Sequence, residues 1–156
     1  MQTKILKLLI LMALPVQFAF SQVEQLKTYT AERFSLQYPA IWIMAEENGI
    51  INFYPKEDYG AITVSFHSNI DFPLSRTKKI ILEIMGITDD PANVKMTEKG
   101  DIIEFYYEHT IENVKWVTKA FRRNDEFYLL TINCELNMWQ KEKMPFIKSL
   151  NSFKIK

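Results

Sequence analysis

The sequence predicts an α+β domain in which a single antiparallel β-sheet of about seven strands is flanked by two main helices. Segments in which apolar and polar residues alternate are typical of half-buried strands, and they recur along the chain from residue 34 onward. Two other segments repeat their apolar residues every three or four positions, which is the spacing of amphipathic helices. Three long strand-like runs follow one another between residues 101 and 136 with short turns between them, which predicts an antiparallel meander.

The first 21 residues have the three parts of a secretory signal peptide. Two lysines come first, an apolar run extends from Leu8 to Phe20, and Ala19 and Ser21 are small residues at the spacing of a cleavage site. We therefore expect cleavage after Ser21, a periplasmic or secreted product, and one domain over residues 22–156. The apolar run is shorter than the roughly 20 residues that cross a bilayer, so we expect no transmembrane anchor in the mature chain.

Charge and cysteine content exclude several classes of function. The full chain carries 19 basic and 19 acidic residues, so removing Lys4 and Lys7 with the signal leaves a net charge of −2. A chain without a basic excess is a poor match for nucleic acid. Cys134 is the one cysteine, and it cannot form an internal disulfide in an oxidising compartment. We expect no cofactor.

Alternation and turn residues mark the strands of the first half. Strands are expected over residues 34–38, 42–44, 50–54 and 62–66. The segment before them, residues 22–30, is polar and shows no clear strand. Pro39 ends the first strand, and Asn48-Gly49 between two apolar runs predicts a tight hairpin. His67 falls on the polar face of the last of these strands.

The second half contains both expected helices. Ser75 is placed to cap the first helix, which Gly86 ends. A weak strand is expected over residues 94–97. Asn137, with a glutamine three residues later, resembles a capping box at the start of the second helix. Pro145 is expected to kink or split that helix.

Two short segments resemble the PsbP-like family. FSLQYPAIW (residues 34–42) is similar to the opening strand of that family, and SLNSFKIK (residues 149–156) is similar to its close. The order of the expected elements also fits. The resemblance implies an antiparallel sheet flanked by helices in small secreted bacterial members, or in photosynthetic accessory subunits that bind other proteins and do no chemistry. It implies no catalytic residues, and no metal ligands of the photosynthetic members match this chain.

Residues that could carry hydrolytic or metal chemistry form no recognised pattern. The chain has two histidines, His67 and His109. Ser65 and Ser68 flank His67, but neighbours on a strand point to opposite faces or lie too far along it to form a catalytic triad. Acidic residues are scattered among turns, and the mature chain offers only three nitrogen or sulfur ligands where structural zinc takes four. We therefore predict no catalytic triad and no metal site.

Glu104 and Glu108 lie on one face of an expected strand. Four residues along a strand span roughly 13 Å, which exceeds the separation of the carboxylates in glycosidases. If residues 112–113 form a two-residue turn, both glutamates lie diagonal to basic residues of the next strand. We interpret them as a charge ladder on a solvated face.

The same turn places His109 opposite Trp116. A three-residue loop over residues 124–126 would then put Cys134 on the far side of Trp116. We prefer this loop because a two-residue loop would move Leu130 and Ile132 to the charged face. His109, Trp116 and Cys134 would then form one row across three strands. This row predicts a buried thiol and a histidine at the edge of the core.

Aromatic residues make up 13% of the chain and are the best-supported basis for a binding surface, since binding requires no motif. The candidates for contact with a ligand or partner are Tyr54, Tyr59, Tyr106 and Phe121. The sequence thus favours an exported, non-enzymatic binding or accessory module that assists an envelope protein complex. Its ligand or protein partner is not identified. The alternative is an enzyme whose site is assembled from dispersed residues.

Overall fold

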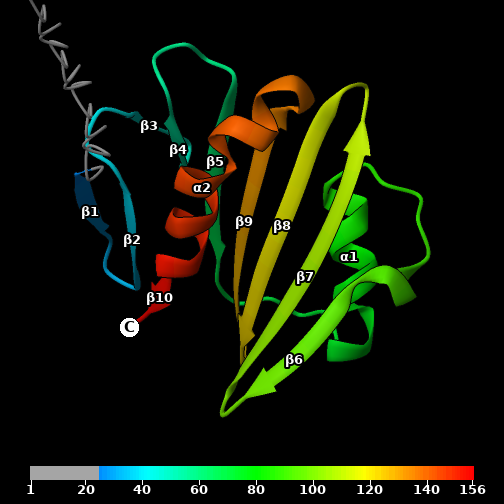
Figure 1. The fold of residues 1–156 in the computed structure, drawn as a ribbon. Coiled ribbons are helices and arrows are strands. Elements are labelled where there is room, and N and C mark those ends of the chain that lie inside the picture. The colour runs from blue at the N-terminus through cyan, green and yellow to red at the C-terminus, as the bar shows by residue number, and fades with distance from the viewer. Residues whose placement is uncertain (1–24) are drawn as a thin grey trace, which may run out of the picture.

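The computed structural model describes residues 25–156, which form two antiparallel sheets and two α-helices (Figure 1). The larger sheet has seven strands, in the order β3 (Ile43–Glu47), β4 (Ile50–Tyr54), β5 (Gly60–His67), β9 (Glu126–Glu135), β8 (Val114–Arg123), β7 (Ile102–Ile111) and β6 (Lys95–Lys99). The smaller sheet contains β1 (Leu26–Thr30), β2 (Phe34–Pro39) and β10 (Lys154–Ile155). The helices are α1 (Thr77–Ile84) and α2 (Leu136–Ser152). The predicted α+β class, with its seven-stranded sheet and two helices, is confirmed.

The smaller sheet was not anticipated. The segment from Phe34 to Pro39 forms a strand as expected, but it pairs with β1 and β10 rather than joining the large sheet. Strand β1 lies in the segment that showed no strand pattern. It is mostly exposed, so nothing in its environment demands an alternation of apolar residues.

Tight turns of the large sheet follow the turn residues of the sequence. Asn48 and Gly49 both have positive φ, at 51° and 76°, and they join β3 to β4. Positive φ at both central residues is the mark of the turn type that suits a two-residue hairpin. Glu112 and Asn113, at 49° and 64°, join β7 to β8 in the same way. Both hairpins are confirmed.

The turn between β8 and β9 corrects the expected register. Arg123 pairs with Glu126, so the loop has two residues rather than three. Cys134 therefore lies opposite Lys115, and Trp116 lies opposite Asn133. The expectation failed because it assumed that only one face of the sheet is buried.

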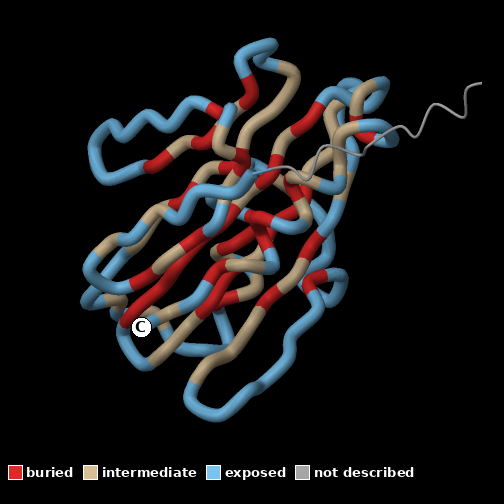
Figure 2. Tube along the Cα trace, turned by 60° about the vertical axis from the view of Figure 1, so that its left-hand side comes forward, coloured by how far each residue is buried: buried red, intermediate tan, exposed pale blue. Residues whose placement is uncertain are grey.

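Both faces of the large sheet are in fact covered. On one face, α2 and the smaller sheet enclose a core that includes Phe34, Leu130 and Phe146. On the other, α1 packs with Phe105 and Leu129. Figure 1 shows α2 beside the smaller sheet and α1 beside β7. Figure 2 shows buried stretches through the middle of the molecule and exposed stretches around its periphery, and strands β3 and β6 are among the exposed segments.

The helix ends differ from the expected caps. Ser75 lies in a 3₁₀ turn (Leu74–Arg76) before α1 and makes no capping hydrogen bond, whereas Gly86 follows the helix with a φ of 67° as expected. Asn137 lies inside α2 rather than capping it, and the helix continues through Pro145 without a break. The expected capping box and split are therefore wrong.

The expected signal peptide and its cleavage after Ser21 lie outside the described residues. Within residues 25–156, neither helix combines the length and the apolar character that a membrane span requires.

Candidate binding cleft

The face of the sheet that carries α1 is only partly covered by that helix. Ile81 and Leu82 of α1 pack over β7, β8 and β9. Further along the same face, β4 and β5 display polar side chains such as Asn52 and Thr63, and the Thr63 hydroxyl donates to Asn52 Oδ1 at 2.7 Å. The helix therefore leaves a boundary at which the apolar core gives way to an open polar surface.

A cleft of about 300 Å³ lies at this boundary. Its lining combines the end of α1 with side chains from three adjacent strands, namely Ile84, Met85, His109, Ile111, Trp116, Leu129 and Thr131. Most of these side chains are apolar, and His109 and Thr131 bring the polar groups. A cleft with apolar walls and a few polar groups is the usual form of a small-molecule site.

His109 and Trp116 contribute two neighbouring rings to the lining of the cleft. They are directly paired across β7 and β8, as the sequence predicted. Their ring centroids are 6.0 Å apart and their planes differ by 7°. Tyr107 also stacks against His109, with ring centroids 5.3 Å apart. Two members of the predicted row of three are therefore neighbours, and the third, Cys134, is not.

The His109 ring has an unsatisfied nitrogen. Nδ1 is buried and has no hydrogen-bond partner within the described part of the chain. Burial, the largest influence, lowers the pKa of His109 below its ordinary value. The Asp89 carboxylate raises this pKa and the Lys115 ammonium lowers it, and the net change is downward. The imidazole is therefore neutral near pH 7.

Asp89 does not orient the His109 ring as an acid does in a catalytic dyad. Its carboxylate instead accepts a short hydrogen bond from the Tyr107 hydroxyl. Burial and this carboxylate raise the pKa of Tyr107 to about 12. The pair fixes the loop after α1 to strand β7 and leaves His109 without a partner acid.

Cys134 lies on the opposite face of the sheet, under α2. It is 1% exposed and its thiol contacts the main-chain carbonyl of Glu135 at 3.5 Å. Burial, followed by the nearby carboxylates of Glu135 and Glu142, raises the pKa of Cys134 to about 11. The predicted burial of the thiol is confirmed, although its position beside Trp116 is wrong.

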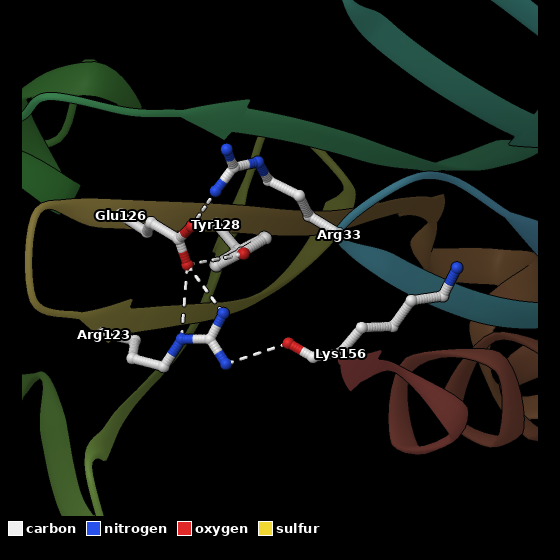
Figure 3. Close-up of polar contacts among 5 residues, drawn as sticks. All are labelled: Arg33, Arg123, Glu126, Tyr128 and Lys156. Atoms are coloured by element: carbon white, nitrogen blue, oxygen red, sulfur yellow. Dashed lines mark hydrogen bonds and ion pairs between the residues drawn. The ribbon is translucent and has the colours of Figure 1, made fainter.

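A second polar cluster surrounds Glu126 (Figure 3). Arg33 contacts Oε1, while Oε2 accepts hydrogen bonds from Arg123 at 2.9 and 3.3 Å and from the Tyr128 hydroxyl at 3.0 Å. Arg123 also donates to the main-chain carbonyl of Lys156 at 3.0 Å. Both carboxylate oxygens are occupied, so the cluster links the smaller sheet, the β8–β9 hairpin and the C-terminal strand rather than offering a reactive group.

The electrostatics of this cluster favour the ionised carboxylate. Burial, the largest influence, raises the pKa of Glu126, but hydrogen bonds from Arg123 and Tyr128 and the attraction of the arginines outweigh it and leave the pKa below its ordinary value. The sequence analysis missed this cluster because Arg33 and Glu126 are 93 residues apart and no local pattern joins them.

Glu104 and Glu108 form the predicted charge ladder. Lys119 lies 3.0 Å from Glu104, and Lys115 lies 2.6 Å from Glu108. The hydroxyl of Tyr106 also donates to Glu108. The two carboxylates pair with separate lysines and do not converge on one site.

The four aromatic candidates lie in different parts of the fold. Tyr54 is on β4 and Tyr106 on β7, with three strands between them, a separation of roughly 19 Å at the usual strand spacing. Phe121 is buried and stacks on Phe153 with ring centroids 5.1 Å apart. The Tyr59 hydroxyl donates to Glu142 on α2 at 3.2 Å. These four residues do not form one continuous patch.

His67 is also remote from the cleft. It is exposed at the end of β5, where Nε2 lies 3.3 Å from the Ser65 hydroxyl. Two strands separate β5 from β7, which places His67 at least about 14 Å from His109. Across residues 25–156, no group of three or more histidine, cysteine, aspartate or glutamate side chains is arranged to hold a metal ion.

Much of the cleft could not be recognised in the sequence. Pairing of His109 with Trp116 followed from the turn residues at 112–113. The contribution of Ile84 and Met85 depends on where α1 ends over the sheet, and alternation within strands carries no information about that position.

Comparison with known proteins shows similarity in structure. No protein-family model and no curated protein sequence matches the chain. Cyanobacterial PsbP (CyanoP) from Synechocystis superposes with a TM-score of 0.66 at 12% identity, covering 88% of this chain and 96% of that one. A structure from Bacteroides thetaiotaomicron matches with a TM-score of 0.49 at 12% identity, over 79% of this chain and 45% of that one. The first of these comparisons shows that the chain has a PsbP-like fold.

Proposed function

We propose that the protein is an exported, non-enzymatic binding module that assists an envelope protein complex, as a small secreted bacterial relative of PsbP. The observation that carries this proposal is the likeness to cyanobacterial PsbP, which extends over 88% of this chain and 96% of that chain. A resemblance of that extent leaves little of the described chain outside the shared fold. The PsbP-like resemblance implies proteins that act by binding others.

The placement of the reactive side chains supports binding over chemistry. Glu126 has both oxygens engaged by arginines and a tyrosine, and Glu104 and Glu108 pair with separate lysines. The Cys134 thiol is buried and has a raised pKa. General acid–base catalysis requires groups that converge on one substrate with suitable pKa values, and these side chains do not converge.

Export is part of the same proposal and rests on the sequence of the first 21 residues. The apolar run and the small residues Ala19 and Ser21 are the features expected of a cleaved signal peptide. N-terminal sequencing of the exported protein should begin at Gln22. A mature protein that retains the first 21 residues would contradict export by this route.

Native electrophoresis of envelope extracts tests the accessory role. We expect an antibody against the chain to detect it in a species much larger than its own mass. A second protein should co-migrate with it through an orthogonal size separation. The double variant Glu104→Gln with Glu108→Gln serves as a control, because it changes two charges without altering either core, and it should remain in the same species. Migration of all the protein as a free monomer would contradict the accessory role.

A further inference from the structure

The cleft at the end of α1 has a size that suits one small ligand. Its volume of about 300 Å³ is at the lower limit of small-molecule sites, which enclose their ligands between mainly apolar walls. A space of this size accommodates a single six-membered ring with small substituents. Assembly of a protein complex does not by itself require such a space.

The walls of the cleft favour a flat ring. His109 and Trp116 present parallel rings, with planes 7° apart. Aliphatic side chains and the Met85 thioether complete the lining. Aromatic rings pack well in offset or edge-on arrangements against other rings, and a thioether makes favourable contacts at a ring edge. The combination is better matched to an aromatic ring than to a flexible alkyl chain.

The protonation of the His109 ring determines which polar group of a ligand it can bind. A buried N–H without an acceptor is rarer in proteins than an acceptor that is not fully used, so Nδ1 is better left unprotonated. In the neutral imidazole the proton then resides on Nε2, and His109 is one of the residues that line the cleft. His109 can therefore donate one hydrogen bond to an oxygen of a bound molecule.

Charge around the cleft favours a neutral ligand. The side chains that line it carry no formal charge once His109 is neutral. The nearest charged groups that act on His109 are Asp89, which binds the Tyr107 hydroxyl, and Lys115, which pairs with Glu108 on the opposite face. A charged ligand would lose its hydration in an apolar cleft without gaining an ion pair, which is costly.

We propose that this cleft binds one neutral aromatic ring that carries a hydroxyl or carbonyl oxygen, with His109 donating a hydrogen bond to that oxygen. This binding site goes beyond the accessory role and stands on the geometry of the cleft alone. The ring can be a free phenolic compound or the side chain of a tyrosine, because both present the same chemistry.

A titration of the exported protein with three matched compounds tests the proposal. The probes are 4-methylphenol, toluene, which lacks the oxygen, and 4-methylbenzoate, which is charged. Nuclear magnetic resonance signals of the Met85 methyl group and the Trp116 indole N–H report on the cleft. We expect 4-methylphenol to shift both signals and to bind about tenfold more tightly than toluene, the gain expected for one hydrogen bond. The benzoate should bind more weakly than either.

Two variants separate the hydrogen bond from the shape of the cleft. His109→Phe keeps a ring but removes the donor, so 4-methylphenol and toluene should bind it with affinities within about twofold of each other. Ile111→Trp fills the rim of the cleft and should abolish binding of both compounds. Ile41→Trp is the matched control, since Ile41 is exposed and does not line the cleft, and it should bind as the unmodified protein does.

Several outcomes would overturn the proposal. One is the absence of shifts at Met85 and Trp116 with millimolar 4-methylphenol. Equal affinity for 4-methylphenol and toluene in the unmodified protein, or undiminished binding by Ile111→Trp, would do the same. A parallel titration with N-acetyltyrosine amide distinguishes the source of the ring. Binding of this compound supports a tyrosine side chain as the ligand, whereas binding of 4-methylphenol alone supports a free phenolic compound.

Discussion

Cys134 illustrates how strand pairing decides the chemistry of a single side chain. A shift of one residue in the β8–β9 register moves the thiol from the face with Trp116 to the face beneath α2. On that face it lies next to Gly60 of β5 and is 1% exposed. Because a thiol reacts as the thiolate and burial raises the pKa of Cys134 to about 11, we expect an unreactive thiol.

The rate at which Cys134 is alkylated tests this expectation directly. Iodoacetamide at pH 8 should label Cys134 slowly in the native protein and rapidly in urea, with mass spectrometry following the modified fraction. The raised pKa also predicts that native labelling keeps increasing with pH up to about pH 11, beyond the pH at which labelling of an ordinary thiol levels off. Rapid native labelling at neutral pH would contradict the buried position.

Gly60 is required by the close approach of β5 and β9. A Cβ at this position would lie 2.4 Å from the Asn133 carbonyl oxygen and 2.9 Å from Cys134 Cα. Both are backbone atoms, so the close contacts of an added Cβ can be relieved only if β5 and β9 move apart. We expect Gly60→Ala to lower the free energy of unfolding by about 3 kcal/mol or more.

The control for this substitution is Gly100→Ala. Gly100 has a φ of +65°, but a Cβ there would meet no atom within 4 Å. Its replacement should cost only about 1–2 kcal/mol, from backbone strain. Urea unfolding of both variants gives the comparison, and an equal or smaller loss for Gly60→Ala would show that the two strands are not in such close contact.

At the scale of elements, Glu126 joins three parts of the fold that the sequence separates. Arg33 lies in the turn between β1 and β2, Arg123 ends β8, and Lys156 follows β10. Loss of the carboxylate would leave two guanidinium groups beside the same partly buried site. We expect Glu126→Gln to lower the free energy of unfolding by about 1–3 kcal/mol near pH 7.

The pH dependence of this effect follows from the lowered pKa of Glu126. A carboxyl group with a lower pKa in the folded state stabilises the fold above its unfolded pKa and loses that contribution as the pH falls through the folded value. The stability difference between the unmodified protein and Glu126→Gln should therefore be constant near neutral pH and shrink below about pH 4.5. Glu104→Gln is the matched control, because its ion pair with Lys119 is more exposed, and it should change stability by less than about 1 kcal/mol. A difference that persists unchanged at pH 3 would contradict the account of Glu126.

Local chemistry determined which elements could be predicted. Asn48-Gly49 and Glu112-Asn113 adopt the positive φ values that a two-residue turn needs, so both hairpins followed from the sequence. The two-residue turn between β8 and β9 was not predicted, because the expected register assumed that the sheet has only one apolar face. Lys115 and Lys119 share their face with Leu130 and Ile132, and α2 covers the apolar part of it.

At the scale of the whole molecule, the fold was more predictable than the candidate site. Most strands and both helices have periodicities that a short window of sequence shows, whereas the exposed strand β1 has none. The cleft depends on the position at which α1 ends above β7, β8 and β9, a relation between segments distant in sequence. Only the pairing of His109 with Trp116 was accessible, because a two-residue turn fixes the register of β7 and β8.

The proposed accessory role predicts that the amount of assembled envelope complex depends stoichiometrically on the amount of this protein. A binding module must be present in numbers comparable to the complex that it assists, whereas an enzyme acts on many molecules in turn. The deciding measurement is to place expression of the chain under graded control in its own host and to quantify the envelope complex identified by native electrophoresis. We predict that the amount of assembled complex rises in proportion to the amount of mature protein until the two are equal. Full assembly at a few per cent of that amount would show that the protein acts catalytically and would contradict the proposed function.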